Sequence, residues 1–395
     1  MQPYFTDLET PLLLINNRIL NANLERGQSL AKAHVQALRP HIKSHKCPAL
    51  ADRQRNLGAT GFTVATLDEA ECFMDAGFTD LFLAYPLVGA TKIRRAFALA
   101  ERGRLILAAD HQDQLRAMSE AALSAGRTLE VRLEVDCGHH RCGVLPGSDL
   151  VILARALVSL GGLKLGGLYT HAGHAYGAPS AEEILHIGGR EGRAVVDATN
   201  LLREVGLQSE AVSAGSTPTL PHCAAIAGVN ELRPGNYVFN DAIQVALGVA
   251  GIEQCALSVL TTVISVFDDR FIIDAGSKAV GLDKGAHGLE KTRGYGLFFE
   301  REEGRKEEEG EKTGEAGRVE GSRSGSGSGG ENWELTRLSE EHGIVTVAPG
   351  GRMPSVGERL RFIPNHACAV VNLHRRLFVV EEGKILTEWQ TVARR

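Results

Sequence analysis

The sequence has no long hydrophobic segment, no excess of positive charge and no leader-like start. Its apolar runs stay well short of the roughly 20 residues that a membrane-spanning helix needs, so we expect no membrane contact. The formal net charge is −5, and no basic stripe with interleaved aromatic residues marks a nucleic-acid-binding surface. The start, MQPYFTDLETPLLLINN, is acidic and lacks arginine, unlike a signal or transit peptide. We therefore expect a cytoplasmic protein that binds neither nucleic acid nor membrane.

The cysteines show no pairing pattern. They are odd in number, lie in apolar segments and form no CxxC pair: Cys47, Cys72, Cys137, Cys142, Cys223, Cys255 and Cys368. This usage predicts reduced thiols rather than a disulfide framework, in agreement with a cytoplasmic location.

Short apolar runs alternate with longer amphipathic stretches over residues 1–248. The expected strands lie at 11–15, 34–43, 61–66, 80–86, 105–110, 129–136, 163–173, 211–216 and 230–239. Strands that alternate with helices predict parallel βαβ units. About eight such units in this length favour an α/β fold of the (β/α)8 TIM barrel type over an open sheet.

Residues 249–395 have a different sequence pattern, with strand-like runs separated by Gly and Pro. They predict a β-rich second domain. An insert at about 301–332 is charged and then rich in Gly and Ser, so we expect it to be a disordered loop without a catalytic role.

Polar clusters follow several expected barrel strands, at the end where barrel enzymes carry their active sites. The clusters are PHIKSHK, DCGHHRCGV, YTHAGHAYG, SAGSTPT and RPGNYVFND. Each alone has an ordinary interpretation: a solvated lysine, hydrogen-bonded structural histidines at His171 and His174, a helix cap or a turn. Their occurrence at one end of one barrel favours a shared site.

Two of these clusters together suggest a phosphate cradle. Gly215, Ser216 and Thr217 offer amides and hydroxyls at a helix start, where an anion is stabilised. Gly235 and Asn236 could add amides from the next strand end. A phosphate opposite a buried lysine is the arrangement expected for pyridoxal phosphate, whose aldehyde reacts with a neutral amine.

The ordered motifs LRPHIKSHK, VDCGHHRCGV, YTHAGHAYG, AGSTPT, LRPGNYVF and IPNHACAVVNLH resemble the D-serine dehydratase and D-threonine aldolase family. These are pyridoxal phosphate enzymes of the alanine racemase type, with a barrel followed by a β domain. The resemblance implies that Lys43 rather than Lys46 bonds the cofactor. It lies two residues after His41, so we expect both on one face of a strand. The resemblance also implies cofactor-site roles for Arg141, Tyr169, Tyr176 and Arg233.

The motif NHAC places His366 two residues before Cys368. On an extended segment both side chains would face the same way, and imidazole with thiolate suits zinc. The resemblance implies that this pair binds a divalent metal (Zn²⁺, or Mn²⁺ or Mg²⁺) and leaves positions open for water or substrate.

The resemblance implies a metal-assisted lyase that acts on small D-β-hydroxy-amino acids. We favour D-serine dehydratase, which forms pyruvate and ammonia with Lys43 as the base at Cα. D-threonine aldolase, with His174 or His171 as a base, and D-threo-3-hydroxyaspartate dehydratase stay open as alternatives. Aldolases of this family typically carry aspartate where this chain has Cys368. A pyridoxal phosphate carrier would lack the second domain, and the resemblance implies a homodimer.

Overall fold

Eight parallel strands form the sheet that organises the first part of the chain. The computed structural model describes residues 5, 7–299 and 332–394. Along the sheet the order is β2 (Ala37–Leu38), β9 (Glu231–Leu232), β8 (Ala211–Ala214), β7 (Leu163–Thr170), β6 (Leu129–Val135), β5 (Arg104–Ala109), β4 (Asp80–Leu83) and β3 (Phe62–Val64). A parallel bridge between His41 and Thr63 joins the two edges and closes the barrel. The predicted α/β barrel is confirmed.

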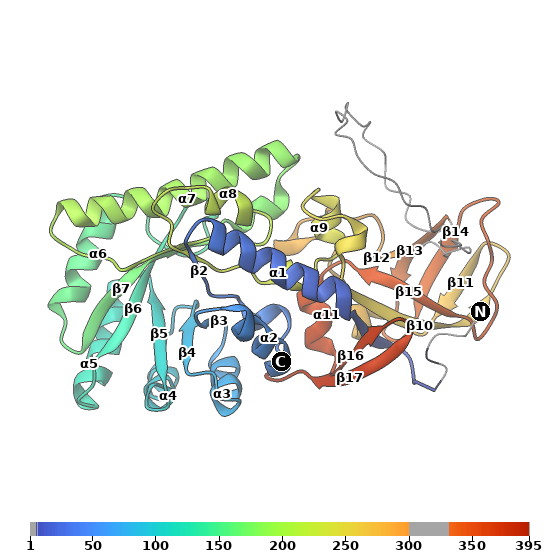
Figure 1. Ribbon diagram of the computed structural model, residues 1–395, viewed down its shortest axis with the longest axis horizontal. Helices are drawn as coiled ribbons and strands as arrows, with labels where there is room; N and C mark the ends of the chain where they lie inside the picture. The colour runs from blue at the N-terminus through green and yellow to red at the C-terminus, as the bar shows by residue number, and fades with distance from the viewer. Residues whose placement is uncertain (1–4, 6, 300–331, 395) are drawn as a thin grey trace, which may run out of the picture.

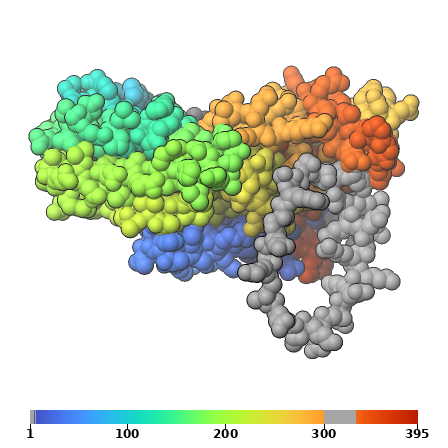
Figure 2. All heavy atoms as spheres, turned by 90° about the horizontal axis from the view of Figure 1, so that it is seen from above, coloured from blue at the N-terminus to red at the C-terminus, as the bar shows by residue number. Residues whose placement is uncertain are grey.

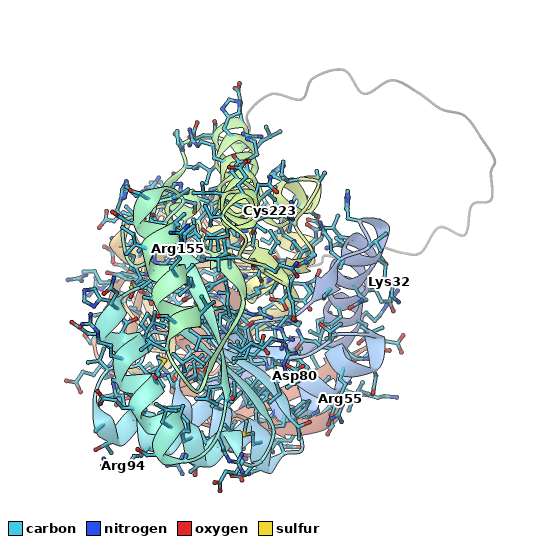
Figure 3. All side chains as sticks on the ribbon, turned by 90° about the vertical axis from the view of Figure 1, so that its left-hand side faces the viewer. Lys32, Arg55, Asp80, Arg94, Arg155 and Cys223 are labelled. Atoms are coloured by element: carbon cyan, nitrogen blue, oxygen red, sulfur yellow. The ribbon has the colours of Figure 1, made fainter. Side chains whose placement is uncertain are left out.

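Helices surround this sheet, as Figure 1 shows in blue to green. They are α1 (Asn17–Ala33), α2 (Pro48–Leu57), α3 (Leu67–Asp75), α4 (Ala90–Ala100), α5 (Gln112–Ser124), α6 (Ser148–Ser159), α7 (Ala181–Glu204) and α8 (Leu220–Ala224). Viewed toward the barrel end, the labelled Lys32, Arg94 and Arg155 belong to α1, α4 and α6 and are exposed (Figure 3). Each helix therefore buries an apolar face on the strands and presents charge outward. No helix among the described residues is long and apolar enough to cross a membrane.

The second domain is a mixed sheet, seen beside the barrel in orange and red (Figures 1 and 2). Its strands are β1 (Leu12–Asn16), β10 (Leu257–Val266), β11 (Arg270–Ile273), β12 (Gly296–Phe298), β13 (Trp333–Leu338), β14 (Gly343–Val347), β15 (Arg359–Pro364), β16 (Arg376–Glu381) and β17 (Lys384–Gln390). Two short helices accompany it, α10 (Ser277–Val280) and α11 (Ala367–Leu373), and a third, α9 (Ala242–Ala246), precedes it in the chain. The expected insert at 301–332 lies, except for Asn332, outside the described residues.

One strand belongs to a different sheet from the one expected. The expectation that residues 11–15 form a barrel strand is wrong. This segment is β1, which pairs antiparallel with β10 and parallel with β16 in the second sheet. The leucines on both faces of β1 are buried. A continuous apolar run of this kind has the same sequence pattern whether its strand lies in a barrel or in a mixed sheet. For the rest of the chain we keep 248/249 as the proposed domain boundary.

A buried ion cluster fills the inside of the barrel. Glu231 accepts from Arg132 at 2.5 Å, from Arg39 at 2.7 Å and from the hydroxyl of Ser213 at 2.5 Å. Burial alone would raise the pKa of Glu231, but the two guanidinium groups hold it well below the ordinary value. This carboxylate therefore stabilises the fold above the ordinary glutamate pKa, and the contribution is lost as the pH falls toward the lowered value.

Glu231→Gln is expected to destabilise the protein by about 3–5 kcal/mol, because two buried cations lose their shared anion. Urea unfolding at neutral pH measures the change. Glu210→Gln is the matched control, because Glu210 pairs with Lys164 on the surface at 2.9 Å and such pairs contribute about 0–1 kcal/mol. Equal losses in the two variants would contradict the assignment of a stabilising role to the buried cluster.

Candidate active site

A cavity of about 500 Å³ lies where the carboxyl ends of the barrel strands face the second domain. Every residue nominated from the sequence except His174 lines it. These are Lys43, Arg141, Tyr169, Tyr176, Gly215, Ser216, Thr217, Arg233, Gly235, Asn236, His366 and Cys368. The last two come from the second domain, so the cavity is built by both domains.

Lys43 sits in a single 3-10 turn, Ile42–Ser44, that follows the short strand β2. The expectation that His41 and Lys43 alternate on a strand is wrong, because the extended backbone ends at His41 and Lys43 lies in the turn that follows. His41 instead caps the turn, and its Nδ1 accepts from the backbone N–H of Lys43 at 3.4 Å. Burial lowers the pKa of Lys43, and Arg141 and Arg233 lower it further, whereas Cys368 opposes them. This lowered pKa favours the neutral amine that covalent chemistry requires.

Lys46 is engaged elsewhere. Its Nζ donates to Asn372 Oδ1 at 2.7 Å and to the carbonyl of Ala393 at 3.0 Å, and lies 3.5 Å from Glu69. These contacts tie the segment before α2 to α3, to α11 and to the C-terminal residues. The difference between the two lysines agrees with the choice of Lys43 as the reactive one.

The loops after β8 and β9 have the properties of an anion cradle. Gly215 has a left-handed φ of +93°, which favours glycine. Thr217 Oγ1 is buried and has no hydrogen-bond partner among the described residues, so it is available to a ligand. A Cβ at Gly235 would lie 2.5 Å from Ser44 Oγ, so the second loop also needs glycine. The residues present therefore fit the phosphate of pyridoxal phosphate.

Glu191 of α7 holds these loops in place and was not foreseen. Its Oε1 accepts from the backbone N–H groups of Gly215 at 3.2 Å and Ala172 at 3.0 Å. Its Oε2 accepts from Thr219 Oγ1 at 2.6 Å, and Thr219 in turn bonds the amide and hydroxyl of Ser216. One fully buried carboxylate thus connects the β8 loop to the loop that carries His171.

Glu191→Gln is expected to weaken pyridoxal phosphate binding about tenfold. The amide cannot accept from every donor that the carboxylate satisfies, and each unsatisfied buried donor costs about 1–3 kcal/mol. Titration of the apoprotein by absorbance measures the affinity. Glu204→Gln, at the exposed end of the same helix, is the control and should bind as the wild type does. Unchanged affinity in Glu191→Gln would contradict the role of Glu191.

Arg233 and Tyr169 form a wall of the cavity. The Arg233 guanidinium donates to Ser213 Oγ and to the carbonyl of Thr170, and lies 5.2 Å over the Tyr169 ring. The Tyr169 hydroxyl donates to Glu134 Oε2 at 2.6 Å, and burial raises its pKa well above the ordinary value. Tyr169 therefore presents an apolar ring with its proton held away, and Arg233 supplies fixed positive charge.

Histidines gather at the mouth of the site. The His139 ring centroid lies 5.0 Å from His287, 5.8 Å from His171 and 6.1 Å from His174. His171 and His287 line the cavity, whereas His174, whose ring stacks on that of His139, does not. Burial lowers the pKa of His287 to about 4 and that of His171 well below 6.5, so both are neutral imidazoles near pH 7.

His287 was missed by the sequence reasoning. It belongs to the second domain, in the 3-10 turn Ala286–Gly288, with a left-handed φ of 58°. Its sequence neighbours, GAHGL, contain no alternation or spacing that indicates a site. Only the packing of the second domain on the barrel brings it to the cavity.

His366 and Cys368 meet at the start of α11. The expectation of an extended segment is wrong, because His366 is the N-cap of α11 and Cys368 lies in its first turn. His366 Nδ1 is buried without a hydrogen-bond partner among the described residues, and Asp283 Oδ2 is 3.7 Å away. Cys368 Sγ lies 3.2 Å from Ser44 Oγ, beside Lys43. An unpartnered imidazole nitrogen next to a thiol fits a divalent metal such as zinc.

Within the described ranges no three His, Cys, Asp or Glu side chains are grouped closely enough to hold a metal by themselves. A metal on His366 and Cys368 would therefore keep positions for water or substrate, which catalysis requires.

Comparison with known proteins identifies the family of the chain. Residues 15–242 match the family "Alanine racemase, N-terminal domain", and residues 256–380 match "Putative serine dehydratase domain". D-threo-3-hydroxyaspartate dehydratase from Delftia sp. HT23 is 36% identical over 93% of both chains. D-threonine aldolase from Arthrobacter is 31% identical over 98% of this chain and 93% of its own. The solved structure of the Delftia enzyme has a TM-score of 0.86 at 33% identity and covers 99% of both chains.

The barrel, the lysine and the second domain thus define a fold-type III pyridoxal phosphate enzyme of the alanine racemase type. The chain belongs to the D-serine dehydratase and D-threonine aldolase family and is a lyase.

Proposed function

We propose that the protein dehydrates D-β-hydroxy-amino acids, with D-serine as the favoured substrate, and that it uses pyridoxal phosphate together with a divalent metal. One observation carries the proposal: the Lys43 amine and the His366–Cys368 pair line the same cavity from opposite domains. This shared lining supports a substrate held with its α carbon at the amine and its β-hydroxyl at the pair. A cysteine variant of the Delftia enzyme, described as being in the metal-free form, supports a metal in this family.

Pyridoxal phosphate, when bound, supplies an electron-accepting ring that acidifies the hydrogen on the substrate's α carbon. Lys43, with its lowered pKa, is the base that removes this proton. A metal held by His366 and Cys368 would act as a Lewis acid toward the β-hydroxyl, which is otherwise a poor leaving group. The hydroxyl takes up the proton that Lys43 removed and leaves as water, and hydrolysis of the remaining enamine gives a 2-oxo acid and ammonia.

Other chain residues bind and orient. The loops at Gly215–Thr217 and Gly235–Asn236 would hold the cofactor phosphate, and Arg233 would face the ring from its buried position. Arg141 and Tyr176 line the same space and would contact cofactor or substrate. We propose no catalytic contact for His174, because it does not line the cavity.

The second candidate is retro-aldol cleavage. The observation in its favour is the pair of neutral imidazoles, His171 and His287, at the cavity wall, either of which could take a proton from a β-hydroxyl. D-threo-3-hydroxyaspartate dehydration stays a third candidate because of the 36% identical relative. Cys368 supports dehydration, since the family's aldolases typically carry aspartate there. We also keep a cytoplasmic homodimer as a proposal.

D-threonine separates the first two candidates, because both reactions accept it and their products differ. Dehydration of D-threonine gives 2-oxobutyrate and ammonia, whereas cleavage gives glycine and acetaldehyde. We expect 2-oxobutyrate to be the main product of the cofactor-loaded, zinc-loaded protein. Glycine as the main product would overturn the dehydratase proposal in favour of the aldolase, with the site unchanged.

A further inference from the structure

Asp241 joins the proposed phosphate cradle to the proposed metal pair. It follows the loop at Gly235–Asn236 and is fully buried. Its Oδ2 accepts two hydrogen bonds, from Asn236 Nδ2 at 2.6 Å and from the backbone N–H of Ala367 at 2.9 Å. Ala367 stands between His366 and Cys368, so a single oxygen atom connects the two sites.

A simple helix cap does not account for this arrangement. Asp241 is the N-cap of α9, but only Oδ1 performs that role, by accepting from the backbone N–H of Gln244 at 3.0 Å. The second oxygen is used across the domain boundary. A backbone bond from the Ile243 N–H to the carbonyl of Asn365, at 3.2 Å, runs beside it and reinforces the link.

Within the second domain, further hydrogen bonds connect the start of α11 to another part of the cavity wall. Asn365, next to His366, is buried and donates through Nδ2 to the carbonyls of Asp283 and Gly294, each at 2.9 Å. These bonds hold the loop that carries Asp283 and His287. The start of α11 therefore cannot shift without disturbing bonds to Asp241 on one side and to this loop on the other.

We propose that Asp241 couples the two sites, so that a divalent metal at His366 and Cys368 strengthens pyridoxal phosphate binding, and the cofactor strengthens metal binding by the same factor. The inference rests on the proposed function for the placement of both groups. A metal fixes the first turn of α11 and hence the Ala367 N–H. The Asp241 carboxylate is then held where it orients Asn236 for the phosphate. Coupling between two sites is reciprocal and commonly amounts to about 5–150-fold in affinity.

The test measures binding rather than turnover. Apoprotein is titrated with pyridoxal phosphate, followed by absorbance, once with saturating zinc and once with EDTA. We expect the apparent Kd in EDTA to be at least about fivefold higher than in zinc. Zinc affinity, measured by competition with a chelating dye, should rise by the same factor when pyridoxal phosphate is present. Pyridoxal lacks the phosphate, so the ratio of its Kd in EDTA to its Kd in zinc (the Kd ratio) should be near one.

Asp241→Asn keeps the size of the side chain but replaces one acceptor oxygen with a donor nitrogen. It should bring the Kd ratio for pyridoxal phosphate close to one. Asp274→Asn is the matched control and should keep the wild-type ratio. Asp274 accepts comparable bonds from Thr261 Oγ1 at 2.6 Å and from the Thr262 N–H at 2.9 Å, but it lines neither site.

A wild-type ratio of one would overturn the coupling without any variant, even if Asp241→Asn failed to fold. An unchanged ratio in Asp241→Asn would overturn the role of Asp241, and an equal ratio for pyridoxal would overturn the route through Asn236. Failure of the proposed function is a separate result. The proposed function fails if the wild-type protein binds no zinc. It also fails if the variants His366→Ala and Cys368→Ala bind zinc with the wild-type affinity.

Discussion

Lys43→Ala is expected to lower turnover by about 10³-fold or more and to remove covalent attachment of pyridoxal phosphate. The variant loses both the amine that bonds the cofactor and the base at the substrate's α carbon, and a positioned base alone contributes about 10²–10⁴-fold. Borohydride reduction of the loaded wild-type protein, followed by peptide mapping, should place the cofactor on the peptide that contains Lys43.

Lys46→Arg is the control for this prediction. It keeps the cation that bonds Asn372 and the carbonyl of Ala393, and it lies three residues away in the same motif. We expect it to retain cofactor attachment at Lys43. Reduced cofactor found on Lys46, or attachment that survives in Lys43→Ala, would contradict the choice between the two lysines.

His366→Ala and Cys368→Ala are each expected to reduce bound zinc and to lower turnover by about 10²-fold or more. A Lewis acid contributes several kcal/mol toward departure of a poor leaving group, and neither remaining side chain can replace the missing ligand. Zinc content per chain, measured by elemental analysis, is read together with the rate of 2-oxo acid formation.

The matched controls are His342→Ala and Cys72→Ala, which remove the same side-chain types away from the cavity. Both should keep the wild-type zinc content and rate. A variant at His366 or Cys368 that lost zinc but kept full activity would remove the metal from the reaction. A variant that kept zinc would mean that the metal lies elsewhere.

The fold was predictable because its signals are local and repeated. Apolar runs alternate with amphipathic helices, and the polar clusters that follow several strands were expected to meet, since parallel strands end at one face. Residues 11–15 were misplaced because an apolar run such as Leu12–Ile15 does not say which sheet it will join. That choice depends on pairing with β10 and β16, far along the chain.

The site residues that stand in short sequence motifs were predictable. Those that reach the site only through tertiary packing were not. Lys43, Thr217 and Cys368 stand in recognisable motifs, and all line the cavity. Glu191 acts through a buried carboxylate on a helix distant in sequence from the loop of Gly215 that it holds. Asp241 stands in the motif RPGNYVFND, but its bond to the backbone N–H of Ala367 spans 126 residues, and no sequence spacing indicates it. His174 shares the YTHAGHAYG motif with His171, but it lies in the 3-10 turn Gly173–Gly177, where its ring stacks on His139 and does not line the cavity.

The most direct test of the central claim is the formation of pyruvate from D-serine by the cofactor-loaded protein, with zinc, with EDTA, and with zinc restored after EDTA. We predict that pyruvate and ammonia form in equal amounts with zinc, that formation stops with the chelator and that it returns when zinc is restored. Pyruvate formation that is unaffected by EDTA would contradict metal-assisted dehydration. An absence of pyruvate from zinc-loaded protein would contradict D-serine as the substrate.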